Sequence, residues 1–202
     1  MTTTSEKPGE IIRADHVPGP RQGEWTYSHY AALPDDGRRY EIIDGVLYMA
    51  PASPLGSHQR TVGRIFYHLT TYVEFAGLGQ IYMAPFDVEL AFHTVVQPDV
   101  LVLLNASIEK IVPTRVIGAP DLVVEVLSPG TAKYDRSKKY HAYARAGVRE
   151  YWIADPLARS VEVLTLEGGE YRPAGVFSGE QMLRSQVVPD FPVAVKEFFP
   201  RD

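Results

Sequence analysis

The stretch Gly118–Pro156 constrains the fold of this chain most. It opens with an apolar run, Leu122–Leu127, whose composition predicts a strand buried on both faces. A Ser-Pro-Gly turn and a basic, helix-like segment follow, and then a second strand-like run, Glu150–Ala154. Glu125 lies in the middle of the first run. A carboxylate inside a buried strand is destabilising unless a cation or hydrogen-bond donors compensate it, so the partner of Glu125 is the main question that the sequence poses.

The composition predicts a globular protein of the cytoplasm. The 202 residues, of which 45% are hydrophobic, suffice for one domain with a real core. The absence of cysteine excludes disulfides, thiolate zinc sites and a cysteine nucleophile, and it fits a reducing compartment. No signal-peptide core and no run of ~18 apolar residues are present, so we expect no membrane contact. A net charge of −5 argues against a surface that coats nucleic acid, but it permits a local basic site.

Hydrophobic periodicity predicts a mixed α/β or α+β domain. Residues 1–23 are polar and rich in Pro and Gly, which indicates a flexible N-terminal arm or an edge extension, and residues 24–202 form the expected single domain. Apolar residues at three- and four-residue spacing predict helices over residues 57–76 and 135–146. We expect these two helices to flank a mixed central β-sheet of about six to nine strands.

A β-hairpin near the N-terminus is the strongest turn signal. Asp44-Gly45 tolerates the positive φ of a tight turn, and strand-like runs flank it at residues 39–43 and 46–50. A short helix is expected just before it, at residues 26–34. Further strands are expected at residues 80–83, 86–90, 95–104, 149–154, 160–166 and 171–177.

Three carboxylates lie where strand patterns predict apolar residues. They are Glu41 in the hairpin, Asp99 within the run 95–104, and Glu125. Oxygen ligands from Asp and Glu suit Mg²⁺ or Mn²⁺, so we interpret the three acids as a metal site. The alternatives are a salt-bridged strand residue for Glu125, a strand start after Pro98 for Asp99, and pairing with a neighbouring arginine for Glu41.

Lys139 is the candidate catalytic lysine on the helix after Glu125. Tyr143 lies four residues further on, shares the helix face of Lys139, and is expected to pack or hydrogen-bond behind the site. Asp135, four residues before Lys139, is interpreted as a helix cap. Lys138 points about 100° away from Lys139, so at most one of the two faces the site. We favour Lys139, and the alternative is that both are solvated. A lysine there can orient a water molecule and neutralise phosphate charge.

The densest basic stretch of this acidic chain, residues 133–149, follows Glu125 and has Asp135 as its single acid. Arg136 and Lys138 in it are candidates for phosphate contacts. His58 is a third candidate, because it lies near the expected start of the long helix, where anions bind; the alternative is a surface histidine near a cap.

Several of these motifs together resemble one known family. They are Tyr40–Gly45, Pro98–Val100, Glu125–Pro129 and Ala146–Pro156, with Lys139 between the last two. This combination is similar to the Uma-type family of restriction endonucleases, within the PD-(D/E)XK nuclease superfamily. The resemblance covers nearly the whole chain.

The resemblance implies a restriction-endonuclease-like core with a mixed sheet flanked by helices. By position, Asp99 corresponds to the acid of the Pro-Asp motif, Glu125 to the acid of the (D/E)XK motif, and Glu41 to an additional acid. The chain departs from the superfamily pattern at Leu127, where the motif lysine would stand, and Lys139 on the next helix takes its place.

The expected function is that of a Mg²⁺- or Mn²⁺-dependent DNA endonuclease. Asp99 and Glu125, helped by the backbone carbonyl of Val126, would hold the metal with support from Glu41, and Lys139 would position the attacking water. Cutting both strands of a duplex predicts a homodimer. The rival hypothesis is a catalytically degenerate protein of the same fold that binds nucleic acid or another protein.

Overall fold

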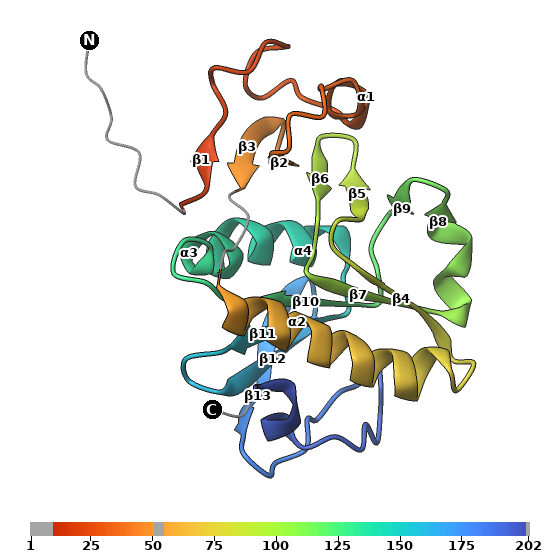
Figure 1. Ribbon diagram of the computed structural model, residues 1–202. Helices are drawn as coiled ribbons and strands as arrows, with labels where there is room; N and C mark the ends of the chain where they lie inside the picture. Colours follow the sequence, from red (N-terminus) through yellow and green to blue (C-terminus); the bar gives the residue numbers. More distant parts are fainter. Residues whose placement is uncertain (1–9, 51–54, 201–202) are drawn as a thin grey trace.

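The computed structural model describes residues 10–50 and 55–200. Figure 1 shows the seven-stranded sheet and the N-terminal turns at the top, with the six-stranded sheet below them. Helix α2 (Gly56–Leu69) lies across the front of the lower sheet, and α4 (Tyr140–Ala146) lies behind it. No helix in these described ranges is long and apolar enough to cross a membrane.

The upper sheet has the order β1-β3-β2-β6-β5-β9-β8. Its neighbouring strands are antiparallel except for the parallel pair β5 and β9. Its strands, in chain order, are β1 (Ile12–Arg13), β2 (Arg39–Ile43), β3 (Val46–Ala50), β5 (Asp87–Ala91), β6 (Thr94–Val96), β8 (Ile111–Val112) and β9 (Arg115–Ile117).

The lower sheet has the order β13-β12-β11-β10-β7-β4. Its only parallel pair within the described ranges is β10 and β11. Its strands are β4 (Gly79–Met83), β7 (Val100–Leu104), β10 (Leu122–Val126), β11 (Glu150–Asp155), β12 (Ser160–Glu167) and β13 (Glu170–Ser178). The mixed α+β class is confirmed, although the strands form two sheets where the sequence suggested one.

Both long helices that the periodicity predicted are present, and each contains a π-helical segment. Helix α2 continues as η1 (Thr70–Glu74), and the second helix begins three residues before the expected Asp135. The second helix is built from α3 (Ala132–Tyr134), the π-helical η3 (Asp135–Lys139) and α4; the remaining short helices are α1 (Tyr27–Ala31), η2 (Asn105–Lys110) and η4 (Val195–Phe198).

Strand β10 lies at the centre of the lower sheet, and its two faces pack against different elements. Leu122, Val124 and Val126 belong to the core cluster under α2. Val123 belongs to the cluster that contains α4, and Glu125 shares its face because side chains alternate along a strand. The strand, helix and strand predicted from Gly118–Pro156 are therefore confirmed, and they turn Glu125 towards the helix that follows it.

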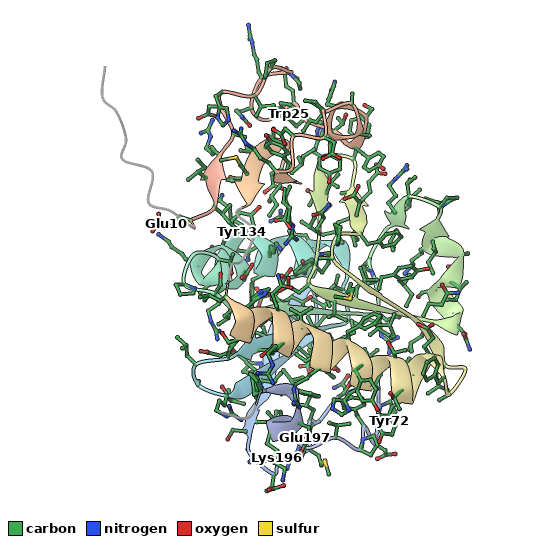
Figure 2. All side chains as sticks on the ribbon, in the orientation of Figure 1. Glu10, Trp25, Tyr72, Tyr134, Lys196 and Glu197 are labelled. Carbon is green, nitrogen blue, oxygen red and sulfur yellow. The ribbon has the colours of Figure 1, made fainter. Side chains whose placement is uncertain are left out.

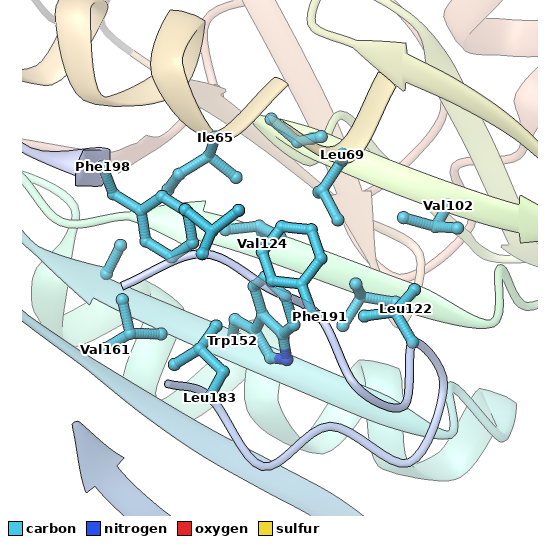
Figure 3. Packing of buried hydrophobic residues seen from close by; sticks show 14 of the residues in the cluster. Ile65, Leu69, Val102, Leu122, Val124, Trp152, Val161, Leu183, Phe191 and Phe198 are labelled. Carbon is cyan, nitrogen blue, oxygen red and sulfur yellow. The ribbon is translucent and has the colours of Figure 1, made fainter. Parts of the chain in front are cut away.

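The core under α2 is apolar and closes the lower face of the molecule (Figure 3). Ile65 and Leu69 of α2 lie over Val124, while Trp152 of β11 packs against aromatic side chains of the C-terminal segment. The ring centroids of Trp152 and Phe191 are 5.9 Å apart. Glu125 lies on the opposite face of β10 from Leu122, Val124 and Val126 of this core.

The hairpin of β2 and β3 forms as predicted. Asp44 and Gly45 have φ of 53° and 71°, the left-handed values that a two-residue turn of this type requires. A Cβ added at Gly45 would lie 2.2 Å from the carbonyl oxygen of Gly23, so this position also needs glycine for close backbone approach. The turn fixes the register of β2, and with it the side of the sheet to which Glu41 points.

The expected continuous strand 95–104 is wrong. It is broken into β6 and β7, which belong to different sheets. Pro98 has no N–H for a strand ladder, and the chain crosses from one sheet to the other there. Asp99 therefore lies at the junction of the two sheets, beside both Glu41 and Glu125, and this break creates the site.

Residues 10–23 lie in the segment that was interpreted as an arm or an edge extension. Strand β1 pairs with β3, and Ala14 is fully buried and donates its N–H to the carbonyl of Leu47. Trp25 is buried below these turns at the top of the molecule (Figure 2). The described part of the segment thus packs along the edge of the upper sheet.

Candidate active site

A small pocket lies where the two sheets and the helix η3 meet. Its volume is about 30 Å³. Four acids, one lysine and one histidine supply most of its polar lining, namely Glu41, Asp99, Glu125, Asp135, Lys139 and His58. All six are buried, with at most 8% of their surface exposed. The structure thus gathers side chains from five separate parts of the sequence into one buried polar site.

Lys139 is the central cation of this pocket. Its Nζ lies 2.9 Å from Oε1 of Glu125 and 2.9 Å from Oε1 of Glu41. It also lies 3.9 Å from Oδ1 of Asp135, which is four residues earlier on the same helix. Asp135 and Lys139 are the first and last residues of the π-helical segment, and π-helical turns are frequent at functional sites.

Glu125 receives a second donor from the same helix. The hydroxyl of Tyr143 donates to Oε1 of Glu125 at 2.5 Å, which confirms the expected role of Tyr143 behind the site. Burial raises the pKa of Glu125 well above its usual value; nearby acids add to the effect, and Lys139 opposes it. Burial also raises the pKa of Asp135, to about 6.

Asp99 is held in a different way. Its Oδ2 accepts the backbone N–H of Val126 at 2.8 Å and lies 3.3 Å from Nε2 of His58. Burial acts to raise the pKa of Asp99, but the donors from His58 and Val126 together hold that pKa below its usual value. Asp99 therefore stays ionised more readily than Glu125 or Asp135, whose pKa values are raised.

Lys139 remains charged in spite of its burial. Desolvation acts to lower the pKa of Lys139, but the carboxylates of Glu125, Glu41 and Asp135 more than offset it, and the pKa is raised above its usual value. Four carboxylates face this one lysine, so negative charge exceeds positive charge among them. Such an excess is reduced by a bound cation or by a proton on one carboxyl group.

The residues fit a divalent metal ion by their donor chemistry. Oxygen ligands from Asp and Glu are those that Mg²⁺ and Mn²⁺ prefer, and Oε2 of Glu41 is buried without a hydrogen-bond partner among the described residues. Within residues 10–50 and 55–200, no three Asp, Glu or His side chains are already arranged around a common point. Glu41, Asp99 and Glu125 are the side chains that would hold an ion.

The pocket contains four of the predicted catalytic and metal-binding residues and one of the three predicted substrate-binding residues. Glu41, Asp99, Glu125 and Lys139 line it, as does His58. Arg136 and Lys138 do not line it.

Both of these basic residues have other contacts on the outer faces of the helix. Arg136 pairs with Glu162, and the ammonium group of Lys138 lies 5.2 Å from the ring centroid of Tyr48. Their contact with substrate stays a prediction.

Sequence reasoning missed two residues of the site. Asp135 is not a helix cap, because it lies inside the π-helical segment with 2% of its surface exposed. Its spacing of four residues from Lys139 was the signal that could have placed it. Gln97 donates its backbone N–H to Oε1 of Glu41 at 3.0 Å, and this contact could not be found without the break at Pro98.

The fold and the pocket define a class of protein. A mixed sheet flanked by helices, with acids from a Pro-Asp turn and from the next strand and a lysine beside them, is the core of the restriction-endonuclease-like proteins. Within this class the chain belongs to the Uma2 family, because residues 27–196 match that family, which is described as "Putative restriction endonuclease".

A solved structure supports the fold independently. The chain is similar to a crystal structure from Anabaena variabilis described as "a putative nuclease belonging to DUF820", with a TM-score of 0.69 and 21% sequence identity. The match covers 87% of this chain and 97% of that one. No curated protein matches the chain.

Proposed function

We propose that this protein is a metal-dependent endonuclease that hydrolyses phosphodiester bonds of DNA. One observation carries the proposal: Glu41, Asp99, Glu125 and Lys139 line one buried pocket in a chain of the Uma2 family. Buried carboxylates beside a lysine destabilise a fold unless each is compensated, so four acids that line one small pocket are better explained by chemistry than by packing.

The acids would bind Mg²⁺ or Mn²⁺, and that ion would stabilise the negative charge that develops on the phosphate oxygens. Asp99 is the ligand that stays ionised, because His58 and the Val126 amide donate to it. Oε2 of Glu41, which is buried and has no hydrogen-bond partner among residues 10–50 and 55–200, would be a further ligand.

Lys139 and Tyr143 would position the reacting groups. The Nζ of Lys139 is held between two carboxylates and has N–H donors for a water or for a phosphate oxygen. Tyr143 fixes Oε1 of Glu125 from behind, so this carboxylate is directed at the pocket. These side chains are almost fully buried, and their burial strengthens each of these electrostatic contacts.

The wider setting of the activity is part of the same proposal. Residues 24–202 would act as one nuclease domain, and two copies would form a homodimer because a duplex has two strands to cut. The absence of cysteine fits action in a reducing cytoplasm.

Nicking of supercoiled plasmid DNA tests the proposal. We expect cleavage with Mg²⁺ or Mn²⁺, none with EDTA, and none from Glu125→Gln with metal. A matched control is Glu162→Gln, which removes a carboxylate on β12 outside the pocket and should leave cleavage intact. Metal-independent binding of DNA without cleavage would instead establish the degenerate, binding-only alternative.

A further inference from the structure

A larger cleft adjoins the catalytic pocket. The pocket itself, at about 30 Å³, has room for on the order of one water molecule and cannot enclose a nucleotide. The neighbouring cleft has a volume of about 400 Å³, which is in the range that holds a small-molecule ligand. Arg39 and Gln97 line both spaces, so the two adjoin each other at these residues. A substrate whose scissile phosphate reaches the pocket can therefore lie partly in this cleft.

Arg39 is fixed at the junction between the two spaces. Its Nε donates to the side-chain oxygen of Gln97 at 3.1 Å, and its Nη2 donates to the backbone carbonyl of Gln97 at 3.3 Å. A guanidinium has five N–H donors, so further donors remain for an anion after these two bonds. Gln97 also contacts Glu41, and a phosphate on Arg39 would thus lie next to the catalytic acids.

The walls of the cleft suit a flat, uncharged group. Leu33, Pro34 and Pro85 supply apolar surface, and the ring of Tyr30 lies among them. The hydroxyl of Tyr30 donates to Asp87 at 2.8 Å and accepts from the side chain of Gln97 at 3.0 Å, which holds the ring in place. Nucleobases stack on such surfaces without regard to sequence.

Asp35 is the one acid among the lining residues of the cleft. Its carboxylate already accepts the backbone N–H of Gly37 at 3.3 Å. The Asp35 carboxylate is compatible with a nearby amino group of a base, but its charge disfavours the binding of a second phosphate. Two arginines, Arg38 and Arg39, also line the cleft, and Arg39 is the one that reaches the catalytic pocket. Apart from these charged residues the walls are largely aromatic and apolar.

We propose that this cleft binds one unpaired nucleotide of the strand that is cut, next to the scissile phosphate. The inference rests on the proposed nuclease function and adds the form of its substrate. Arg39 contacts the phosphate of that nucleotide, and its base lies against Tyr30. The volume of the cleft, about 400 Å³, suits one nucleotide, and Arg39 and Tyr30 offer one site each for a phosphate and a base. The substrate in this proposal is a single strand or a duplex with an unpaired nucleotide at the cut.

Two neighbouring alanines provide a matched pair of variants. Ala31 lines the cleft, whereas Ala32 lines a neighbouring cavity that meets the cleft at Leu33 and Pro34. Ala32 itself does not line the cleft, and both alanines are exposed. Ala31→Phe fills the cleft, and Ala32→Phe adds the same bulk outside it. Neither change removes a buried contact, so both variants are expected to fold, which thermal unfolding checks.

The probe is a short fluorescein-labelled oligothymidylate, compared with a blunt duplex and with the same duplex carrying one unpaired nucleotide. Binding is measured with EDTA and cleavage with Mn²⁺. We expect Ala31→Phe to raise the Kd and KM for the single strand about tenfold with kcat nearly unchanged. We expect Ala32→Phe to change neither Kd nor KM. We also expect the blunt duplex to be cut most slowly.

The outcomes separate the two hypotheses. If the wild type cleaves DNA but the two alanine variants behave alike, or if the blunt duplex is the best substrate, the nucleotide cleft is refuted and the nuclease stands. If the wild type neither binds nor cleaves any of these substrates, the proposed function itself is refuted, and the cleft proposal fails with it.

Discussion

The ammonium group of Lys139 lies 2.9 Å from Oε1 of Glu125 and joins it to Glu41, which lies 2.9 Å away on the other side. Glu125 belongs to the lower sheet and Glu41 to the upper sheet. One buried cation therefore holds acids from both sheets together. Lys139 has a structural role as well as a proposed catalytic one, and experiments on it must measure both.

Replacing Lys139 with Met should destabilise the fold in a pH-dependent manner. The change leaves Glu41, Glu125 and Asp135 buried without their cation, so we expect a loss of about 3–5 kcal/mol near neutral pH. Lys139 acts to lower the pKa of both Glu125 and Asp135, so its removal raises these pKa values further. An acid whose pKa is higher in the folded state than in the unfolded state destabilises the fold when the pH lies above the folded-state pKa. This cost vanishes when the pH lies below the unfolded-state pKa, so the stability lost in Lys139→Met should shrink as pH falls.

Urea unfolding of Lys139→Met at several pH values makes this measurement. Lys138→Met is the matched control, because Lys138 is the exposed neighbour on the same helix, and its stability should change by less than about 0.5 kcal/mol. An equal effect of the two substitutions would contradict the central position of Lys139.

Glu125→Gln should abolish cleavage while leaving the fold intact. The amide keeps the size of the side chain and can still accept from Tyr143, but it removes the charge that would bind metal. We expect the nicking rate to fall by at least about 10²-fold, with a Tm within a few degrees of that of the wild type. Plasmid nicking and thermal unfolding of the same preparation are the two measurements. A variant that cuts at the wild-type rate would exclude Glu125 as a metal ligand.

Asp135 should make the fold less stable as pH rises through the weakly acidic range. Its pKa is raised to about 6 from the usual value of 3.8. Between these values the folded state keeps a proton that the unfolded state has lost, so the contribution of Asp135 to stability falls with rising pH and the full cost is present above about pH 6. Asp135→Asn should remove this pH dependence. Its free energy of unfolding should therefore rise relative to that of the wild type by up to about 3 kcal/mol between about pH 4 and about pH 7. If the stability of the wild type and that of Asp135→Asn depended on pH in the same way, the buried placement of Asp135 would be contradicted.

Divalent metal should stabilise the folded protein. At a concentration of Mn²⁺ one hundred times its Kd, the free energy of unfolding should rise by about 2.7 kcal/mol, and EDTA should reverse the shift. Glu41→Gln should reduce this shift because it removes the acid with the unpartnered oxygen, whereas Glu162→Gln should not. Thermal unfolding with and without Mn²⁺ makes the comparison. Equal shifts in all three proteins would place the metal elsewhere.

Glu150 provides the contrasting case of a buried acid that serves structure alone. Its carboxylate accepts from the indole of Trp152 and the hydroxyl of Ser185, both at 2.6 Å, and from the amides of Gln186 and Val187. An amide nitrogen in Glu150→Gln would face some of these donors, so we expect a loss of about 2–4 kcal/mol in stability. The nicking rate per folded molecule should stay unchanged, as a nicking assay corrected for the folded fraction would show.

Local features of the fold could be predicted from the sequence. The hairpin at Asp44-Gly45, the long helix after Pro54 and the strand, helix and strand of Gly118–Pro156 depend on backbone preferences and periodicity within short windows. The division into two sheets could not be predicted, because Pro98 ends a ladder without indicating which partner the next strand takes. The family motifs identified three of the acids and the lysine of the candidate site.

By itself, the sequence determined which carboxylates are anomalous, because Glu41, Asp99 and Glu125 lie in strand-like apolar runs. Only the tertiary structure showed what compensates each buried acid. Glu150 meets neutral N–H and O–H donors that satisfy both of its oxygens, whereas Glu125 meets Lys139 and lies in a pocket with three other acids. The physical reason is that the energy of a buried charge depends on the groups within a few ångströms of it, and those groups come from distant parts of the chain.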